Sequence, residues 1–92
     1  MAEYLLEIYV SRTDPDAVAD GTERARRAAE VLRREGTPVR FLRTMFVPED
    51  ETCFYLYEGA NEQAVREAAR RAGLPVERIV EAVTPAGEGA PM

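Results

Sequence analysis

The sequence predicts one α+β domain whose four strands and two helices follow each other in the order β-α-β-β-α-β. Two helical patterns predict this class, because each has a capping side chain before it and a glycine after it. Four short segments rich in β-branched and aromatic residues surround the helices. The length of 92 residues is enough for one modest core. We expect the domain to span residues 1–83 and residues 84–92 to form a flexible tail with nothing to pack.

The first strand is expected over residues 3–10, where side chains alternate between two faces. One face is uniformly apolar and is the one that we expect the helices to cover; it carries Tyr4, Leu6, Ile8 and Val10. The other face carries Glu3, Leu5, Glu7 and Tyr9. This phase places Glu7 near the middle of the sheet's open face, away from the helices.

The two helices are bounded by clear signals. Thr13-Asp14-Pro15 predicts the start of the first helix, since a capping residue precedes a proline suited to the first turn. Gly21 interrupts its apolar stripe and predicts a kink or a separate first turn, and Gly36 predicts its end. Asn61 predicts the cap of the second helix, which the pattern Gly73-Leu74-Pro75 ends in the manner of a Schellman motif.

The second strand is expected over residues 39–47, before a charged turn at 48–51. Both of its faces mix apolar and polar residues. We expect Leu42 to face the helices, which places Phe41, Arg43 and Met45 on the open face.

The third strand, over residues 52–58, is expected to point Phe54 and Leu56 inward. Its outward side chains are then Cys53, Tyr55 and Tyr57. The fourth strand, over residues 78–83, adds Ile79, Glu81 and Val83 to the open face.

With right-handed crossovers, this order gives the ferredoxin-like arrangement, an antiparallel four-stranded sheet with both helices on one face. The open face is then too apolar for water, so we expect a homodimer in which two sheets meet face to face. The apolar side chains expected there are Leu5, Tyr9, Phe41, Met45, Tyr55, Tyr57, Ile79 and Val83.

The composition of the chain argues against several classes of binding partner. The net charge is −5 and no basic cluster stands out, which argues against nucleic acid and against an anionic membrane surface. The longest apolar run is too short for a membrane span. One cysteine cannot form an internal disulfide, and the first residues carry no apolar signal segment, so a cytoplasmic protein is expected.

Several segments resemble one family of small proteins, largely catalogued as a domain of unknown function. They are FLRTMFVPEDETC at 41–53, AVREA at 64–68, AGLP at 72–75 and RIVEAV at 78–83. The resemblance extends from Tyr4 to Val83, and the family is known as the nickel-binding, ferredoxin-like, dimeric proteins. It implies a small dimeric binding protein and nickel as a ligand.

The sequence departs from that pattern because it contains no histidine, and nickel favours imidazole nitrogen. The remaining candidate metal ligands are Glu7, Cys53 and Glu81. Carboxylates with one thiol make a poor nickel site, so the cofactor stays unidentified.

Five open-face side chains are the candidate site: Glu7, Arg43, Tyr55, Tyr57 and Glu81. The two glutamates lie on neighbouring strands, where one could act as a general acid or base. Arg43 could hold an anion, and the tyrosines could stack on a planar small molecule. The alternative is that the charges form salt bridges and the tyrosines fill an interface, since Tyr and Arg are common interface residues.

A binding protein that holds a ligand or metal on the open sheet face is the leading hypothesis. The alternative is a dimeric α+β-barrel-type enzyme acting on a small organic substrate, with Glu7 or Glu81 as acid–base group and Tyr55 as orienting donor. Cys–His and Ser–His catalysis are excluded because there is no histidine. RNA recognition by stacking on Tyr55 and Tyr57 is disfavoured by the acidic charge. A structural subunit is the fourth hypothesis.

Overall fold

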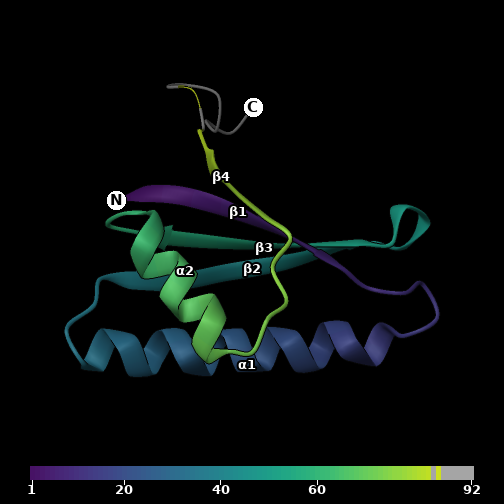
Figure 1. Ribbon diagram of the computed structural model, residues 1–92, viewed down its shortest axis with the longest axis horizontal. Coiled ribbons are helices and arrows are strands. Elements are labelled where there is room, and N and C mark those ends of the chain that lie inside the picture. The colour runs from purple at the N-terminus through teal and green to yellow at the C-terminus, as the bar shows by residue number, and fades with distance from the viewer. Residues whose placement is uncertain (84, 86–92) are drawn as a thin grey trace, which may run out of the picture.

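The computed structural model describes residues 1–83 and 85 and has the predicted order of elements (Figure 1). These are β1 (Ala2–Tyr9), α1 (Pro15–Arg34), β2 (Val39–Val47), a 3-10 turn (Pro48–Asp50), β3 (Thr52–Gly59), α2 (Glu62–Arg71) and β4 (Arg78–Ala82). The predicted tail over 84–92 lies outside the described residues, apart from Pro85.

The four strands form one antiparallel sheet in the order β2-β3-β1-β4, with β1 and β3 at its centre. Both helices pack on one face of the sheet, and their side chains join those of the strands in one hydrophobic core (Figure 1). The predicted ferredoxin-like fold is therefore confirmed.

The helix ends follow the predicted signals, except that the side-chain cap predicted at the start of α1 is absent. Helix α1 begins at Pro15 and Asp14 occupies the N-cap position, but only its backbone carbonyl takes part, accepting a hydrogen bond from the Ala17 N–H at 3.2 Å. The Asn61 side chain caps α2 by accepting from the Ala64 N–H at 2.9 Å. The kink or separate first turn predicted at Gly21 is wrong, because α1 is one continuous helix that runs straight in Figure 1.

The C-terminal end of α2 is held in two ways. The Leu74 N–H donates to the Ala69 carbonyl at 3.0 Å and Gly73 has a φ of +71°, as in a Schellman motif. Arg24 of α1 also donates to the Ala72 carbonyl at 2.7 Å. Because a cation at a helix C-terminus is favourable, Arg24 ties the two helices together.

The core confirms the predicted phase of β1. Tyr4, Leu6, Ile8 and Val10 are all buried against the helices. Alternation along the strand therefore leaves Glu7 on the open face, as expected.

The predicted phase of β3 is wrong. Tyr55 pairs with Leu6 and Tyr57 with Tyr4, and residues directly opposite each other in a sheet point to the same face. Cys53, Tyr55 and Tyr57 therefore lie in the core, with Tyr55 only 2% exposed and Tyr57 fully buried.

Small residues on the helices explain why the tyrosines point inward. The buried faces of α1 and α2 are built largely from glycine and alanine, so long side chains from the sheet must fill the layer between them. The Tyr55 hydroxyl lies directly against Gly21 of α1, where an added Cβ would clash with it.

Phe54 and Leu56 consequently lie on the open face, where inward positions were predicted. Leu56 pairs with Leu5 and Phe54 with Glu7 across the two central strands. Leu56 is only 7% exposed although it is outside the helix-covered core, because its neighbours on the open face shield it.

Strand β2 is divided by a register shift between Phe41 and Arg43. Phe41 packs against the core, with its ring edge-on to Tyr57 at 5.4 Å, so its predicted open position is wrong. Leu42 is the extra residue of this bulge and is not part of the core, against the prediction. Arg43, which pairs with Leu56, lies on the open face as predicted.

The phase of β4 is also inverted relative to the prediction. Val80 pairs with Leu5 and lies on the open face, whereas Ile79 pairs with Leu6 and packs against the core. Because side chains alternate with a period of two, one wrong assignment moves every residue of a strand to the other face.

We predict that Gly21→Ala destabilises the protein by about 1–3 kcal/mol through overpacking against Tyr55. An exposed helical glycine replaced by alanine would instead gain about 1 kcal/mol. Urea unfolding measures the difference. In a Tyr55→Phe background the loss should shrink, since the nearest ring carbon then lies 3.3 Å away. An equal loss in both backgrounds would contradict the proposed contact.

Candidate functional site: the open sheet face

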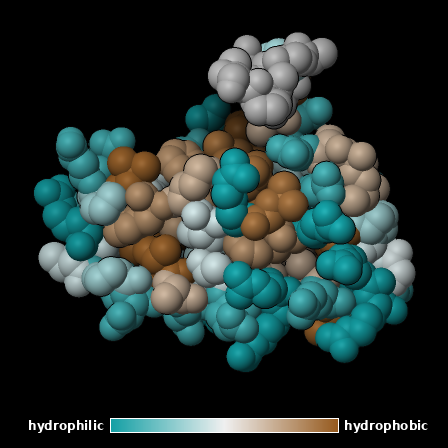
Figure 2. All heavy atoms as spheres, turned by 180° about the vertical axis from the view of Figure 1, so that it is seen from behind, coloured by the Kyte–Doolittle hydropathy of each residue, from teal (hydrophilic) through white to brown (hydrophobic). Residues whose placement is uncertain are grey.

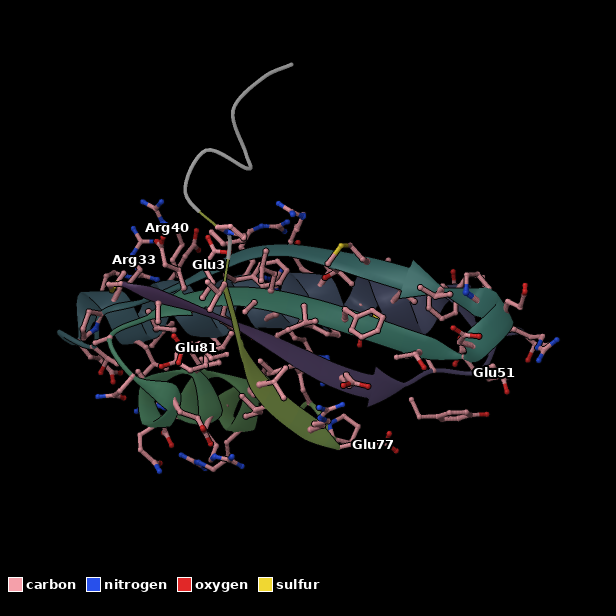
Figure 3. The ribbon with its side chains drawn as sticks, turned by 90° about the horizontal axis from the view of Figure 1, so that it is seen from above. Glu3, Arg33, Arg40, Glu51, Glu77 and Glu81 are labelled. Atoms are coloured by element: carbon pink, nitrogen blue, oxygen red, sulfur yellow. The ribbon has the colours of Figure 1, made fainter. Side chains whose placement is uncertain are left out.

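The open face is built from rows of cross-strand neighbours. Its apolar centre comes from all four strands and consists of Leu5, Met45, Phe54, Leu56 and Val80. Figure 3 looks onto the sheet with α1 behind it, and Figure 2 shows from another side how hydrophobic groups emerge between charged ones. Such a surface is typical of an interface or a ligand site.

Glu7 lies beside this apolar centre. Its carboxylate accepts a hydrogen bond from the Arg78 guanidinium at 3.1 Å, and its side chain is 29% exposed. The Glu7 carbonyl accepts from the Glu77 N–H at 2.9 Å, which holds the start of β4 against β1. Arg78 is therefore the counter-ion of Glu7, a pair that was not predicted from the sequence.

The side chain of Glu81 does not lie on the same face of the sheet as that of Glu7. Glu81 pairs with Tyr4 and so belongs to the helix-covered side of the sheet, where its side chain is exposed. The expected neighbouring carboxylates therefore lie on opposite faces of the sheet, and that prediction is wrong. Arg43, in contrast, is on the open face and exposed.

Tyr55 and Tyr57 are separated from the open face by the sheet itself. Burial and the nearby Cys53 raise the pKa of Tyr55 to about 12. Burial also raises the pKa of Tyr57 and that of the Cys53 thiol. The Tyr57 hydroxyl is buried without a hydrogen-bond partner among the residues that the structure describes. Neither tyrosine can stack on a ligand bound to the open face.

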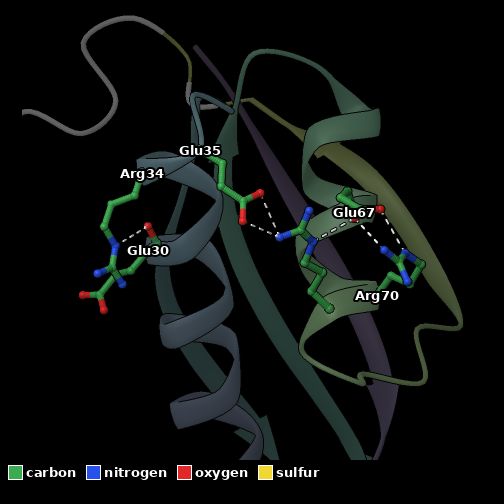
Figure 4. Close-up of polar contacts among 6 residues, drawn as sticks. Glu30, Arg34, Glu35, Glu67 and Arg70 are labelled. Atoms are coloured by element: carbon green, nitrogen blue, oxygen red, sulfur yellow. Dashed lines mark hydrogen bonds and ion pairs between the residues drawn. The ribbon is translucent and has the colours of Figure 1, made fainter.

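Most of the other ion pairs lie on the helices. Hydrogen bonds from Arg70 and Arg71 lower the pKa of Glu67 to about 2. Arg71 also reaches Glu35 at the end of α1, at 3.0 Å (Figure 4). The Arg71–Glu35 pair links the two helices, the Glu67 pairs lie within α2, and each of these exposed pairs contributes little.

One feature of the sequence relates to the observed phase of β3. Gly21 within a helix is compatible with the close approach of a large side chain, but it does not show which strand residue approaches, and the structure identifies Tyr55. Turning Tyr55 inward then places Phe54 and Leu56 on the open face, because side chains alternate.

Fold and face together define a small ferredoxin-like protein with an uncovered, largely apolar sheet face. Residues 10–82 match the family model described as nickel responsive protein SCO4226-like, so the chain belongs to this family. Its structure is similar to the crystal structure of SCO4226 from Streptomyces coelicolor A3(2), with a TM-score of 0.68 and 22% sequence identity. That match covers 92% of this chain and 100% of the other. No curated protein matches the chain.

The residues of this chain do not fit a nickel site. The sequence has no histidine, and within residues 1–83 and 85 no three acidic or cysteine side chains are grouped to hold a metal ion. Glu7 bonds Arg78, Cys53 is in the core, and Glu81 lies across the sheet. The three candidate ligands are therefore not brought together.

We predict that the purified protein shows no tight nickel binding, because imidazole is absent and the candidate ligands diverge. Isothermal titration with Ni²⁺ after chelator treatment measures this, and metal analysis of the untreated protein is the control. Saturable micromolar or tighter binding, at about one ion per two chains, would contradict the expectation and indicate ligands from two copies.

We also predict that stability falls at alkaline pH. The pKa of Tyr55 is about 12 in the folded protein against 10.0 for a free tyrosine, so the folded state holds its proton more tightly. This stabilisation is complete below about pH 10 and is lost as the pH rises towards about 12. Urea unfolding across this range should show the fall, and Tyr55→Phe should reduce it. A pH-independent midpoint would contradict it.

Proposed function

We propose that this member of the SCO4226-like family is a small homodimeric binding protein that holds its ligand on the open sheet face. The observation that carries the proposal is the apolar centre of that face, which α1 and α2 leave uncovered. Surfaces of this composition are usually covered by a partner or a ligand. A second copy of the chain would remove both open faces from water at once.

The chemistry of the face favours a small organic ligand over a metal ion. Phe54 and Leu56 offer apolar contact to a ligand. Beside them, the Glu7 carboxylate offers a hydrogen-bond acceptor and the Arg78 guanidinium offers a forked set of N–H donors. Small-molecule sites commonly combine such an apolar lining with a few placed polar groups. A metal ion would need several converging oxygen, nitrogen or sulfur ligands.

The enzyme hypothesis receives less support. Its orienting donor Tyr55 is in the core, and its two acid–base candidates lie on opposite faces of the sheet. RNA recognition also receives less support, because the two tyrosines that would stack on bases are buried in the core. The cytoplasmic location remains part of the proposal and is supported by the single cysteine, which is a free and buried thiol.

We predict that the wild-type protein is a dimer and that Phe54→Lys makes it monomeric. Burying an unpaired ammonium in the interface costs several kcal/mol, which corresponds to a rise in the dimer dissociation constant of about a hundredfold or more. Light scattering after size exclusion gives the mass of each species. Native mass spectrometry of the untreated protein shows any bound organic molecule.

Val31→Lys is the matched control, because Val31 is a 40% exposed apolar residue on α1. It should leave the dimer intact, and circular dichroism confirms that both variants fold. A monomeric wild-type protein would overturn the proposal, and so would a Phe54→Lys variant that dimerises as tightly as the wild type.

A further inference from the structure

The open face carries two acidic side chains that oppose each other directly. Glu3 of β1 pairs with Glu58 of β3, and both are half-buried. They share the open face with Leu5 because alternate residues point the same way. Like charges directly opposite on neighbouring strands are destabilising. No cation of the described residues lies within 4.0 Å of either carboxylate.

Two exposed arginines lie on the same face, along the edge strand β2. Arg40 pairs in register with Glu58, and Arg43 lies one row further along, opposite Leu56. Neither forms an ion pair with another residue of the described chain. Figure 3 shows Glu3 and Arg40 at the same end of the sheet. Within the described part of the chain, the face therefore carries charges of both signs that form no ion pair within 4.0 Å, although Arg40 stands directly opposite Glu58 on the neighbouring strand.

Such a surface is complementary to itself. In a two-fold symmetric dimer each patch meets a copy of the same patch, so cations of one copy can meet anions of the other twice. We propose that the two copies are aligned by ion pairs in which Arg43 of one copy contacts Glu3 and Glu58 of the second. This inference rests on the proposed homodimer and specifies how its faces are oriented.

Sheet geometry permits this arrangement. With strands about 4.8 Å apart and alternate residues about 6.7 Å apart, the backbones at Arg43 and Glu58 are separated by about 8 Å on the face. Consider a two-fold axis in the plane between the sheets that lays Arg43 of one copy over Glu58 of the other. This axis runs diagonally to the strands and passes between Leu5 and Leu56. The same rotation lays Phe54 over the apolar residues of β4. The two sheets then cross steeply, close to orthogonal sheet packing.

Charge reversal tests the inference. The variants are Arg40→Glu/Arg43→Glu, which makes the cationic corner acidic, and Glu3→Arg/Glu58→Arg, which makes the acidic pair basic. Each variant alone should raise the dimer dissociation constant by about tenfold or more, because like charges then meet across the interface. An equimolar mixture should restore wild-type affinity as a heterodimer, which native mass spectrometry distinguishes from either homodimer.

The matched control is Arg27→Glu/Arg34→Glu, which makes the same change in net charge as Arg40→Glu/Arg43→Glu but on the exposed surface of α1. It should leave the dissociation constant unchanged. Circular dichroism checks folding, and the single reversals Arg43→Glu and Glu58→Arg replace any double variant that does not fold.

The outcomes separate the two proposals. A monomeric wild-type protein overturns the homodimer itself. A wild-type dimer whose two reversal variants remain equally tight overturns the ion pairs alone. Weakened variants that are not rescued by mixing also overturn the ion pairs, since the charges would then matter without facing each other.

Discussion

The fold depends on the contact between large side chains of the sheet and very small residues of the helices. Helices α1 and α2 present glycine and alanine to the core, so the sheet must supply most of its volume. Tyr55 and Tyr57 fill this space, and the Tyr55 hydroxyl reaches Gly21 of α1. Because an added Cβ at Gly21 would clash with this hydroxyl, the contact requires a glycine there.

That contact also determines the character of the opposite face. When Tyr55 and Tyr57 turn inward, alternation turns Phe54 and Leu56 outward and aligns them with Leu5. The protein thus has hydrophobic residues on both sides of one sheet while only one side has helices. The uncovered side is where binding energy for a second copy or a ligand is available, since burial of apolar area is the dominant favourable term in association.

The description of the family mentions nickel, whereas this chain carries no histidine, the side chain that nickel favours. Membership among the nickel responsive SCO4226-like proteins comes from the match over residues 10–82, and it is independent of any metal ligand. This chain has no imidazole, and its open face instead combines apolar side chains with carboxylates and guanidinium groups. The fold by itself therefore assigns no ligand to this chain, because function resides in side chains placed on the fold.

The order of elements, the helix ends at Asn61 and Gly73 and the phase of β1 could be predicted from the sequence, because local capping and a uniformly apolar face determine them. So could the positions of Glu7 and Arg43. The phases of β3 and β4 could not, since both faces of these strands carry apolar residues and the hydroxyl of a tyrosine does not decide its side. Only the tertiary structure decided them. The small residues of the helices leave space that Tyr55 and Tyr57 fill, so these two side chains point inward. Cross-strand register then places Arg78 beside Glu7 and places Glu81 on the other face of the sheet.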